Sequence, residues 1–228
     1  MVVVRSLLLI ISRASSGYIQ MKSYFLSIFF IVSLLCSPAL KASDVNLLIK
    51  LLRNISTLTG EFTQIIVDEE GQELENSQGF FDIARPSKMA WKITTPLEQQ
   101  IISDGELLWL YDPDLDQVII ESAKLSFNKS PIALFTSDPS LIAKRYKVES
   151  KSTDSHLNFV LTPNDSSSMF DEIRVNFVNE LPRSIDLLDR FNHKTTIFFD
   201  KVELNTVITD STFNFIAPPN IDIVNNVR

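Results

Sequence analysis

The sequence has few of the residues on which most catalytic and metal sites depend. It contains one cysteine, Cys36, and two histidines in 228 residues. His156 and His193 are far apart, both lie beside predicted turns, and no cysteine stands near them, so we expect no metal site. Cys36 lies inside an apolar run near the N-terminus. The rest of the chain therefore has no disulfide and must be stabilised by its hydrophobic core.

Glycine is also scarce, with five residues, and the glycine-rich motifs of phosphate and dinucleotide sites are absent. The nucleophile motif Gly-x-Ser-x-Gly is absent as well. Asp112, Asp114 and Asp116 resemble the start of a calcium loop. However, Gln117 stands where that loop needs glycine, and Ala123 stands where it needs a bidentate glutamate. We therefore predict a turn here, and no catalytic residue, metal or cofactor anywhere in the chain.

Acidic residues are missing from the first 42 positions. Met21-Lys22 gives a charged start, Tyr24 to Leu35 forms an apolar run, and Ala39 or Ala42 offers a small residue for cleavage, which is typical of a secretory signal. The run is shorter than the ~20 apolar residues of a membrane-spanning helix, although an uncleaved anchor is the alternative. Residues 1–20 precede this signal, so the true start could be Met1 or Met21.

We expect residues 1–42 to be an upstream extension plus signal peptide, and residues 43–228 to form a single domain. Removing residues 1–42 leaves 17 basic and 28 acidic residues, a net charge of −11. An acidic surface argues against nucleic acid as a partner. It suits a soluble exported protein that must not bind anionic membranes.

Two periodicities follow along the expected domain. Val45, Leu48, Leu52 and Ile55 are spaced for one face of a helix that Ser43 or Asp44 could cap and that ends near Gly60. From Glu61 the apolar period becomes two, as in Met89, Trp91 and Ile93, and turn residues recur about every ten positions. These patterns predict a mostly β fold, a meandering antiparallel sheet with one N-terminal helix.

One interval departs from the strand pattern. Ser130-Pro131 precedes a short apolar run, and Ser137 to Ala143 could form another helical turn, so we predict a helical insertion that folds over the sheet. The tail is predicted to contain a last short strand at Phe213-Asn214-Phe215, followed by a stiff exit at Pro218-Pro219.

Many of these segments together resemble one family, in matching order and spacing over nearly all of the expected domain. It is the family of periplasmic outer-membrane lipoprotein carriers, the LolA chaperones. The segments that carry the resemblance are Phe62-Thr63-Gln64, Ser77-Gln78-Gly79, Arg85-Pro86, Trp91, Ser103-Asp104-Gly105, Leu108-Trp109, Tyr111-Asp112-Pro113, Gln117, Ser130-Pro131, Phe159-Val160-Leu161-Thr162-Pro163, Phe213-Asn214-Phe215 and Pro218-Pro219.

The resemblance implies an unclosed antiparallel β-barrel, or half-barrel, with the N-terminal helix and the insertion as a lid. It implies that Arg85 bonds to backbone carbonyls of the lid, at Leu134, Phe135 and Thr136, and holds an empty cavity shut. The expected cavity lining is apolar and comprises Met89, Trp91, Ile93, Trp109, Tyr111, Leu48 and Leu52. Many family members have phenylalanine where this chain has Met89, and methionine is apolar and adaptable enough to keep the cavity.

The resemblance also implies a function and partners. The protein would be a periplasmic chaperone, a monomer, that takes acylated lipoproteins from an ATP-driven transporter of the inner membrane to a receptor of the outer membrane. Three alternatives stay open: that receptor, which shares the fold but should carry a lipidated cysteine, a periplasmic carrier of another lipid, and a lipid enzyme. Residue by residue, Arg85 could instead pair with Asp82, and the aromatic residues could be ordinary core.

Overall fold

The computed structural model describes residues 43–228 except 129, 154 and 228, so the predicted extension and signal lie outside the described residues. Its strands form a single twelve-stranded sheet in the order β12-β6-β5-β4-β3-β2-β1-β11-β10-β9-β8-β7. The strands are β1 (Thr57–Val67), β2 (Glu73–Ala84), β3 (Lys88–Thr95), β4 (Gln99–Asp104), β5 (Leu107–Asp112), β6 (Gln117–Ser122), β7 (Tyr146–Ser152), β8 (His156–Pro163), β9 (Phe170–Val178), β10 (Leu181–Asp189), β11 (Lys194–Leu204) and β12 (Asp222–Asn225).

The sheet consists of two meanders, β1 to β6 and β7 to β11, which join where β1 pairs with β11. Every neighbouring pair is antiparallel except β12, which runs parallel to β6. Within the described residues β12 and β7 are the two edges of the sheet and do not pair with each other, so the sheet does not close. The predicted mostly β, unclosed antiparallel architecture is therefore confirmed.

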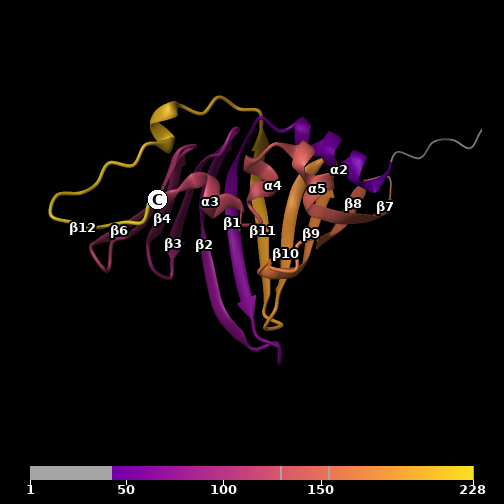
Figure 1. Ribbon diagram of the computed structural model, residues 1–228, viewed down its shortest axis with the longest axis horizontal. Coiled ribbons are helices and arrows are strands. Elements are labelled where there is room, and N and C mark those ends of the chain that lie inside the picture. The colour runs from indigo at the N-terminus through magenta and orange to yellow at the C-terminus, as the bar shows by residue number, and fades with distance from the viewer. Residues whose placement is uncertain (1–42, 129, 154, 228) are drawn as a thin grey trace, which may run out of the picture. The chain divides into compact units, whose positions relative to one another are not determined.

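Helices lie over one face of this sheet (Figure 1). They are α2 (Asp44–Arg53), α3 (Ala123–Asn128), α4 (Ala133–Thr136), the 3-10 helix η1 (Pro139–Leu141) and α5 (Ile142–Arg145). We call the stretch from α4 to α5, residues 133–145, the lid segment. Helix α2 buries Leu48, Ile49, Leu51 and Leu52. It ends at Arg53, earlier than the predicted Gly60, because the β-branched and apolar run from Thr57 enters strand β1.

The tail differs from its prediction. Phe213 ends a 3-10 helix, η2 (Asp210–Phe213), and the last strand is β12, so no strand forms at residues 213–215. Phe213 is buried, and Asp210 forms an ion pair of 2.7 Å with Lys88 of β3. A helical turn at this point brings Phe213 against the sheet, which a continuing strand with alternating side chains would not do.

The helix-covered face carries the main hydrophobic core. The rings of Phe62 and Trp91 stack with centroids 3.9 Å apart, and Phe81 contacts Trp91 and Phe199 at 5.7 and 5.3 Å. Phe135 of α4 meets Phe199 edge to face at 6.0 Å. Offset and edge contacts of this kind add to the stabilisation from burial itself. The lid segment therefore packs directly on the sheet through α4.

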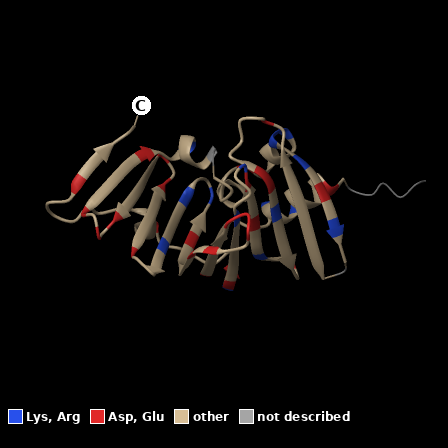
Figure 2. Cartoon of the chain, turned by 90° about the horizontal axis from the view of Figure 1, so that it is seen from below, with Lys and Arg blue, Asp and Glu red and all other residues tan. Residues whose placement is uncertain are grey.

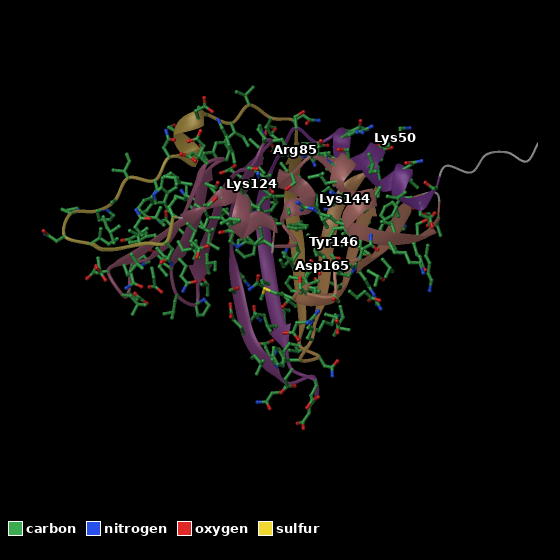
Figure 3. All side chains as sticks on the ribbon, in the orientation of Figure 1. Lys50, Arg85, Lys124, Lys144, Tyr146 and Asp165 are labelled. Atoms are coloured by element: carbon green, nitrogen blue, oxygen red, sulfur yellow. The ribbon has the colours of Figure 1, made fainter. Side chains whose placement is uncertain are left out.

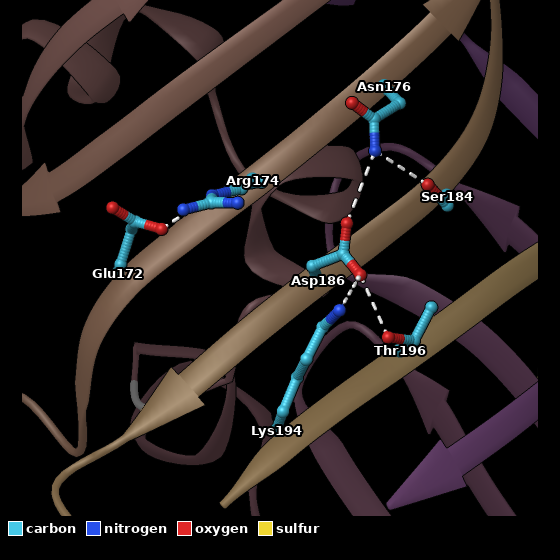
Figure 4. A network of polar contacts seen from close by, with 7 residues as sticks. All are labelled: Glu172, Arg174, Asn176, Ser184, Asp186, Lys194 and Thr196. Carbon is cyan, nitrogen blue, oxygen red and sulfur yellow. Dashed lines mark hydrogen bonds and ion pairs between the residues drawn. The ribbon is translucent and has the colours of Figure 1, made fainter. Parts of the chain in front are cut away.

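The opposite face is polar over β9, β10 and β11. Asn176 donates to Ser184 and Asp186, Thr196 donates to Asp186, and Lys194 lies 3.6 Å from the same carboxylate (Figure 4). Lys, Arg, Asp and Glu lie scattered along the strands rather than in one patch (Figure 2). The main apolar side of this half of the sheet therefore lies beneath the helices, although Phe198 is exposed on the opposite face.

Candidate functional site beneath the lid segment

Arg85 joins helix α2 to the lid segment. It follows β2, and its backbone N–H donates to Ser56 O at 3.1 Å, which places its side chain at the end of α2. Its Nη1 donates to Leu52 O and Ile55 O, and its Nη2 donates to Leu134 O at 3.3 Å. The last carbonyls of a helix have no partner within the helix and attract cations. One guanidinium therefore bridges the end of α2 and the start of the lid segment.

The charge of Arg85 persists despite its partial burial. Burial lowers the pKa of Arg85 from its ordinary value to about 10, and the nearby Asp138 carboxylate acts in the opposite direction. Asp138 itself has a lowered pKa, chiefly because its side chain accepts hydrogen bonds from Ser140, with Arg53 and Arg85 contributing. A group with a pKa of about 10 is protonated at neutral pH. The Arg85 contacts are therefore charge-assisted hydrogen bonds, which are stronger than neutral ones.

The surface alternative for Arg85 does not describe this structure. Asp82 accepts a hydrogen bond of 2.7 Å from Thr59 Oγ1 on the neighbouring strand β1. The two residues have different partners because Asp82 lies within β2, whereas Arg85 lies beyond its end. The side chain of Arg85 thus contacts main-chain carbonyls rather than a carboxylate.

The three residues predicted as lid partners are all buried but differ in their contacts. Leu134 accepts from Arg85, as above. Thr136 O accepts from the backbone N–H of Ser87 at 3.0 Å, and Phe135 is fully buried against Phe199. The structure brings Leu134 to Arg85 and ties Thr136 to the turn that follows it, while Phe135 supplies packing. Whether these contacts work as a latch stays a prediction.

Five of the seven predicted cavity residues come together. Leu48, Leu52, Met89 and Trp91 are buried in one cluster, and Ile93 packs against it. Phe135 belongs to the same cluster. Helix α4 therefore packs into this cluster through Phe135.

Trp109 and Tyr111 lie elsewhere, which corrects their predicted place in the cavity. Leu108 of the same strand, β5, belongs to the main core cluster, and successive residues of a strand point to opposite faces. The rings of Trp109 and Tyr111 instead contact Phe215 of the tail, with centroids 6.2 and 5.4 Å away. These two residues therefore belong to a second apolar cluster on the outer face, beneath the C-terminal segment.

This placement gives a prediction for Trp109. Replacing it with alanine should lower the free energy of unfolding by about 2 kcal/mol, because the ring is only partly buried. Binding of a fluorescent fatty acid should stay unchanged, since Trp109 lies outside the cluster around Leu48, Leu52, Met89 and Trp91, which we call the inner cluster. Urea titration and probe titration measure the two effects. Loss of probe binding without loss of stability would contradict the placement.

Sequence reasoning missed how helix α2 is held. Asp44 at its start accepts from the backbone N–H and the hydroxyl of Ser150 on β7, at 2.9 and 2.7 Å. After its end, Asn205 bonds to Asn54 O and to Ser56 N at 2.9 and 2.8 Å. These are long-range pairs of polar residues in predicted loops or helix ends. No local sequence signal identified them.

The candidate site combines an apolar sheet face, a helical cover and one arginine that bridges parts of that cover. Over residues 53–216 the sequence matches the family described as outer membrane lipoprotein carrier protein LolA. The chain belongs to this family. The match includes Arg85, Ile55 and the whole lid segment, and it begins one residue after Leu52, the third acceptor of Arg85.

Two LolA relatives are similar over most of their length. The outer-membrane lipoprotein carrier protein of Hahella chejuensis is 35% identical over 185 residues, which cover 80% of this chain and 88% of the relative. The protein of the same name from Pseudomonas putida is 33% identical over 181 residues, covering 79% and 86%.

A solved structure supports the fold alone. It is an uncharacterized conserved protein from Thermus thermophilus, with a TM-score of 0.53 and 10% identity, covering 81% of this chain and 100% of that one. Among the described residues of the present protein, no helix has the length and apolar character to cross a membrane.

Proposed function

We propose that this protein is a periplasmic chaperone that binds the acyl chains of lipoproteins released from the inner membrane and delivers them to the outer membrane. Membership in the lipoprotein carrier family is the observation that carries the proposal. The family is one of carriers rather than of enzymes. The inner apolar face beneath short helices is the feature of the structure that supports this role.

The physical need for such a carrier follows from the cargo. A lipoprotein anchor with up to three acyl chains has ~40 methylenes, and burial stabilises each by about 0.8 kcal/mol, an upper bound of roughly 30 kcal/mol. Such an anchor cannot cross water unaccompanied. Leu48, Leu52, Met89, Trp91 and Ile93 offer an apolar surface without polar groups that would select one cargo.

Release of the cargo requires that the closed protein without cargo be close in free energy to the loaded protein. Phe135 fills the space above the cluster in the closed state, and Arg85 holds α4 there through Leu134 O. Hydrogen bonds to a charged group contribute a few kcal/mol at most, enough to bias the lid without locking it. Opening and closing then become a population shift.

The proposal includes two partners and a monomeric state. An ATP-driven transporter of the inner membrane would load the protein, and a receptor of the outer membrane would take the lipid from it. The sequence has no nucleotide-binding motif, so the energy for loading would come from the transporter. The net charge of −11 for residues 43–228 would keep the carrier away from anionic lipid surfaces between the two.

Incubation with spheroplasts tests the proposal. Protein purified from the periplasm should release acylated lipoproteins into the supernatant, and the amount released should rise with protein added and vanish when ATP is depleted. A periplasmic sugar-binding protein at equal concentration serves as the control. Absence of lipoprotein in the supernatant, together with another lipid in the purified protein, would show that the cargo is different.

A further inference from the structure

An open cleft of about 800 Å³ is lined by the lid segment but not by Arg85. One wall is formed by Leu141 of η1, Lys144 of α5 and Tyr146 at the start of β7, and the other by the loop between β8 and β9, with Asp165 and Met169. Figure 3 labels three residues of the cleft, Lys144, Tyr146 and Asp165, together with Arg85. A volume of this size lies within the range of about 300–1,000 Å³ typical of small-molecule sites.

The cleft is continuous with the inner apolar cluster. Ile173 lines the cleft and is itself a buried member of that cluster, and Tyr146 and Phe170 line it and pack against the cluster. No polar layer separates these three residues from the core. A chain end that entered the cleft would therefore meet the inner face of the sheet directly.

A second, much smaller hollow adjoins the cleft at the lid segment. This hollow of about 10 Å³ shares Leu141, Arg145 and Tyr146 with the cleft, and Leu134 lines it too. Leu134 is the residue whose carbonyl Arg85 binds. The hollow has about the size of one water molecule, so the lid segment packs closely here.

Asn164 closes this side of the lid segment. Its backbone N–H donates to Arg145 O at 2.8 Å, and its side-chain Nδ2 donates to Lys144 O at 3.0 Å. These carbonyls end α5, so Asn164 joins the last turn of the lid segment to the β8–β9 loop. The lid segment is thus tethered at both ends, by Arg85 and Ser87 on one side and by Asn164 on the other.

We propose that the cleft between α5 and the β8–β9 loop is the entry site for an acyl chain, and that Leu141 and Met169 contact the chain as it passes inward. This inference rests on the proposed function, since it assigns a place to the acyl cargo. Leu141 and Met169 are large apolar side chains exposed at the rim, with 37% and 61% of their surface accessible. An acyl chain in the cleft gives both residues an apolar partner.

Charge at the rim tests the proposal. Met169→Arg places a cation in the path of the chain and should weaken binding of dansyl-undecanoic acid about tenfold, because the charge loses water when the chain is bound. Leu115→Arg is the matched control, since Leu115 is 68% exposed in the β5–β6 turn and does not line the cleft. It should bind the probe within about twofold of wild type.

A fluorophore locates the chain independently of affinity. The only cysteine, Cys36, lies in the segment predicted to be removed, so Met169→Cys and Leu115→Cys can each be labelled singly with an environment-sensitive dye. A triacylated lipopeptide should shift the emission of the dye at 169 to the blue and leave that at 115 unchanged.

The outcomes separate this inference from the function. Equal probe affinity for the two arginine variants, or equal dye responses, would overturn the entry site while the carrier function stood. Failure of the wild type to bind either acyl probe would overturn both. Circular dichroism of each variant verifies folding, and Met169→Leu, which keeps the apolar rim, should bind as the wild type does.

Discussion

Arg85→Leu should yield a protein that still accepts lipoprotein but passes it on poorly. The substitution removes the hydrogen bonds to Leu52 O, Ile55 O and Leu134 O and puts an apolar side chain in their place. Only the bond to Leu134 O joins Arg85 to the lid segment, so this is the bond that movement of α4 would break. Without it we expect the open, loaded state to become relatively more stable, so that cargo stays bound.

The loss should act mainly on the lid segment. Helix α2 keeps its attachments through Asp44 to Ser150 and through Asn205 to Asn54. Helix α4 keeps only the Ser87–Thr136 backbone bond and its packing on that side. We therefore expect α4 to move while α2 stays on the sheet, which hydrogen exchange of residues 133–136 would detect.

The size of the effect can be estimated. Hydrogen bonds to a charged group contribute about 1.5–3 kcal/mol each, and the cost of partial burial of Arg85 offsets part of that sum. Since only the bond to Leu134 O reaches α4, a net change of about 2 kcal/mol would shift the ratio of closed to open protein roughly thirtyfold. The assay measures transfer of radiolabelled lipoprotein from the loaded variant to outer-membrane vesicles.

Arg85→Lys provides the matched control for charge. Lysine keeps the cation, but one ammonium group cannot reach the carbonyls on α2 and on α4 together as the guanidinium fork does. Its transfer should fall between those of the wild type and the leucine variant. Wild-type transfer by Arg85→Leu would show that the bridge has no part in release.

The sequence predicted the sheet better than it predicted which face of each strand is covered. In β3 the alternation of Met89, Trp91 and Ile93 with Lys88 and Lys92 distinguishes an apolar face from a polar one. In β5 both faces are apolar, because Leu108 and Leu110 alternate with Trp109 and Tyr111. The C-terminal segment covers the second face, and no local pattern in β5 predicts that contact.

The acceptors of Arg85 were also only partly predictable. Leu134 followed from the family resemblance, whereas Leu52 and Ile55 did not. A main-chain carbonyl can be offered by any residue type, so the side chains of Leu52 and Ile55 carry no trace of this role. The sequence does contain an amphipathic helix and an isolated arginine. Since the carbonyls at a helix end attract cations, the end of this helix is a reasonable place to expect the arginine to bind.

Gly79→Ala should be the most destabilising single-methyl change in the described domain that we can argue from contacts. Gly79 lies in β2 between Phe62 of β1 and Ile93 of β3, at a shift in the β2–β3 register. A Cβ there would lie 1.9 Å from Lys92 O and 2.9 Å from the Phe62 ring. The carbonyl belongs to the neighbouring strand and cannot rotate away as a side chain could.

The strand pair must therefore separate, and the damage should reach the core. Phe62 stacks on Trp91, so displacing it disturbs the inner cluster at its most closely packed aromatic pair. We expect a loss of about 3 kcal/mol or more in the free energy of unfolding, at the upper end for overpacked sites. Urea denaturation followed by tryptophan fluorescence measures it, and the same structural change should weaken acyl-probe binding.

Gly71→Ala separates steric overlap from loss of glycine as such. Gly71 lies in the turn between β1 and β2 with a φ of +83°, and a Cβ there has no atom within 4 Å. Its substitution should cost only the backbone strain of a left-handed alanine, about 1 kcal/mol. If the two variants lost the same stability, the close approach of Lys92 O to Gly79 could not be what requires glycine in β2. A much larger loss of stability at Gly79 would instead show that the inner face of the sheet can pack as it does only because residue 79 has no side chain.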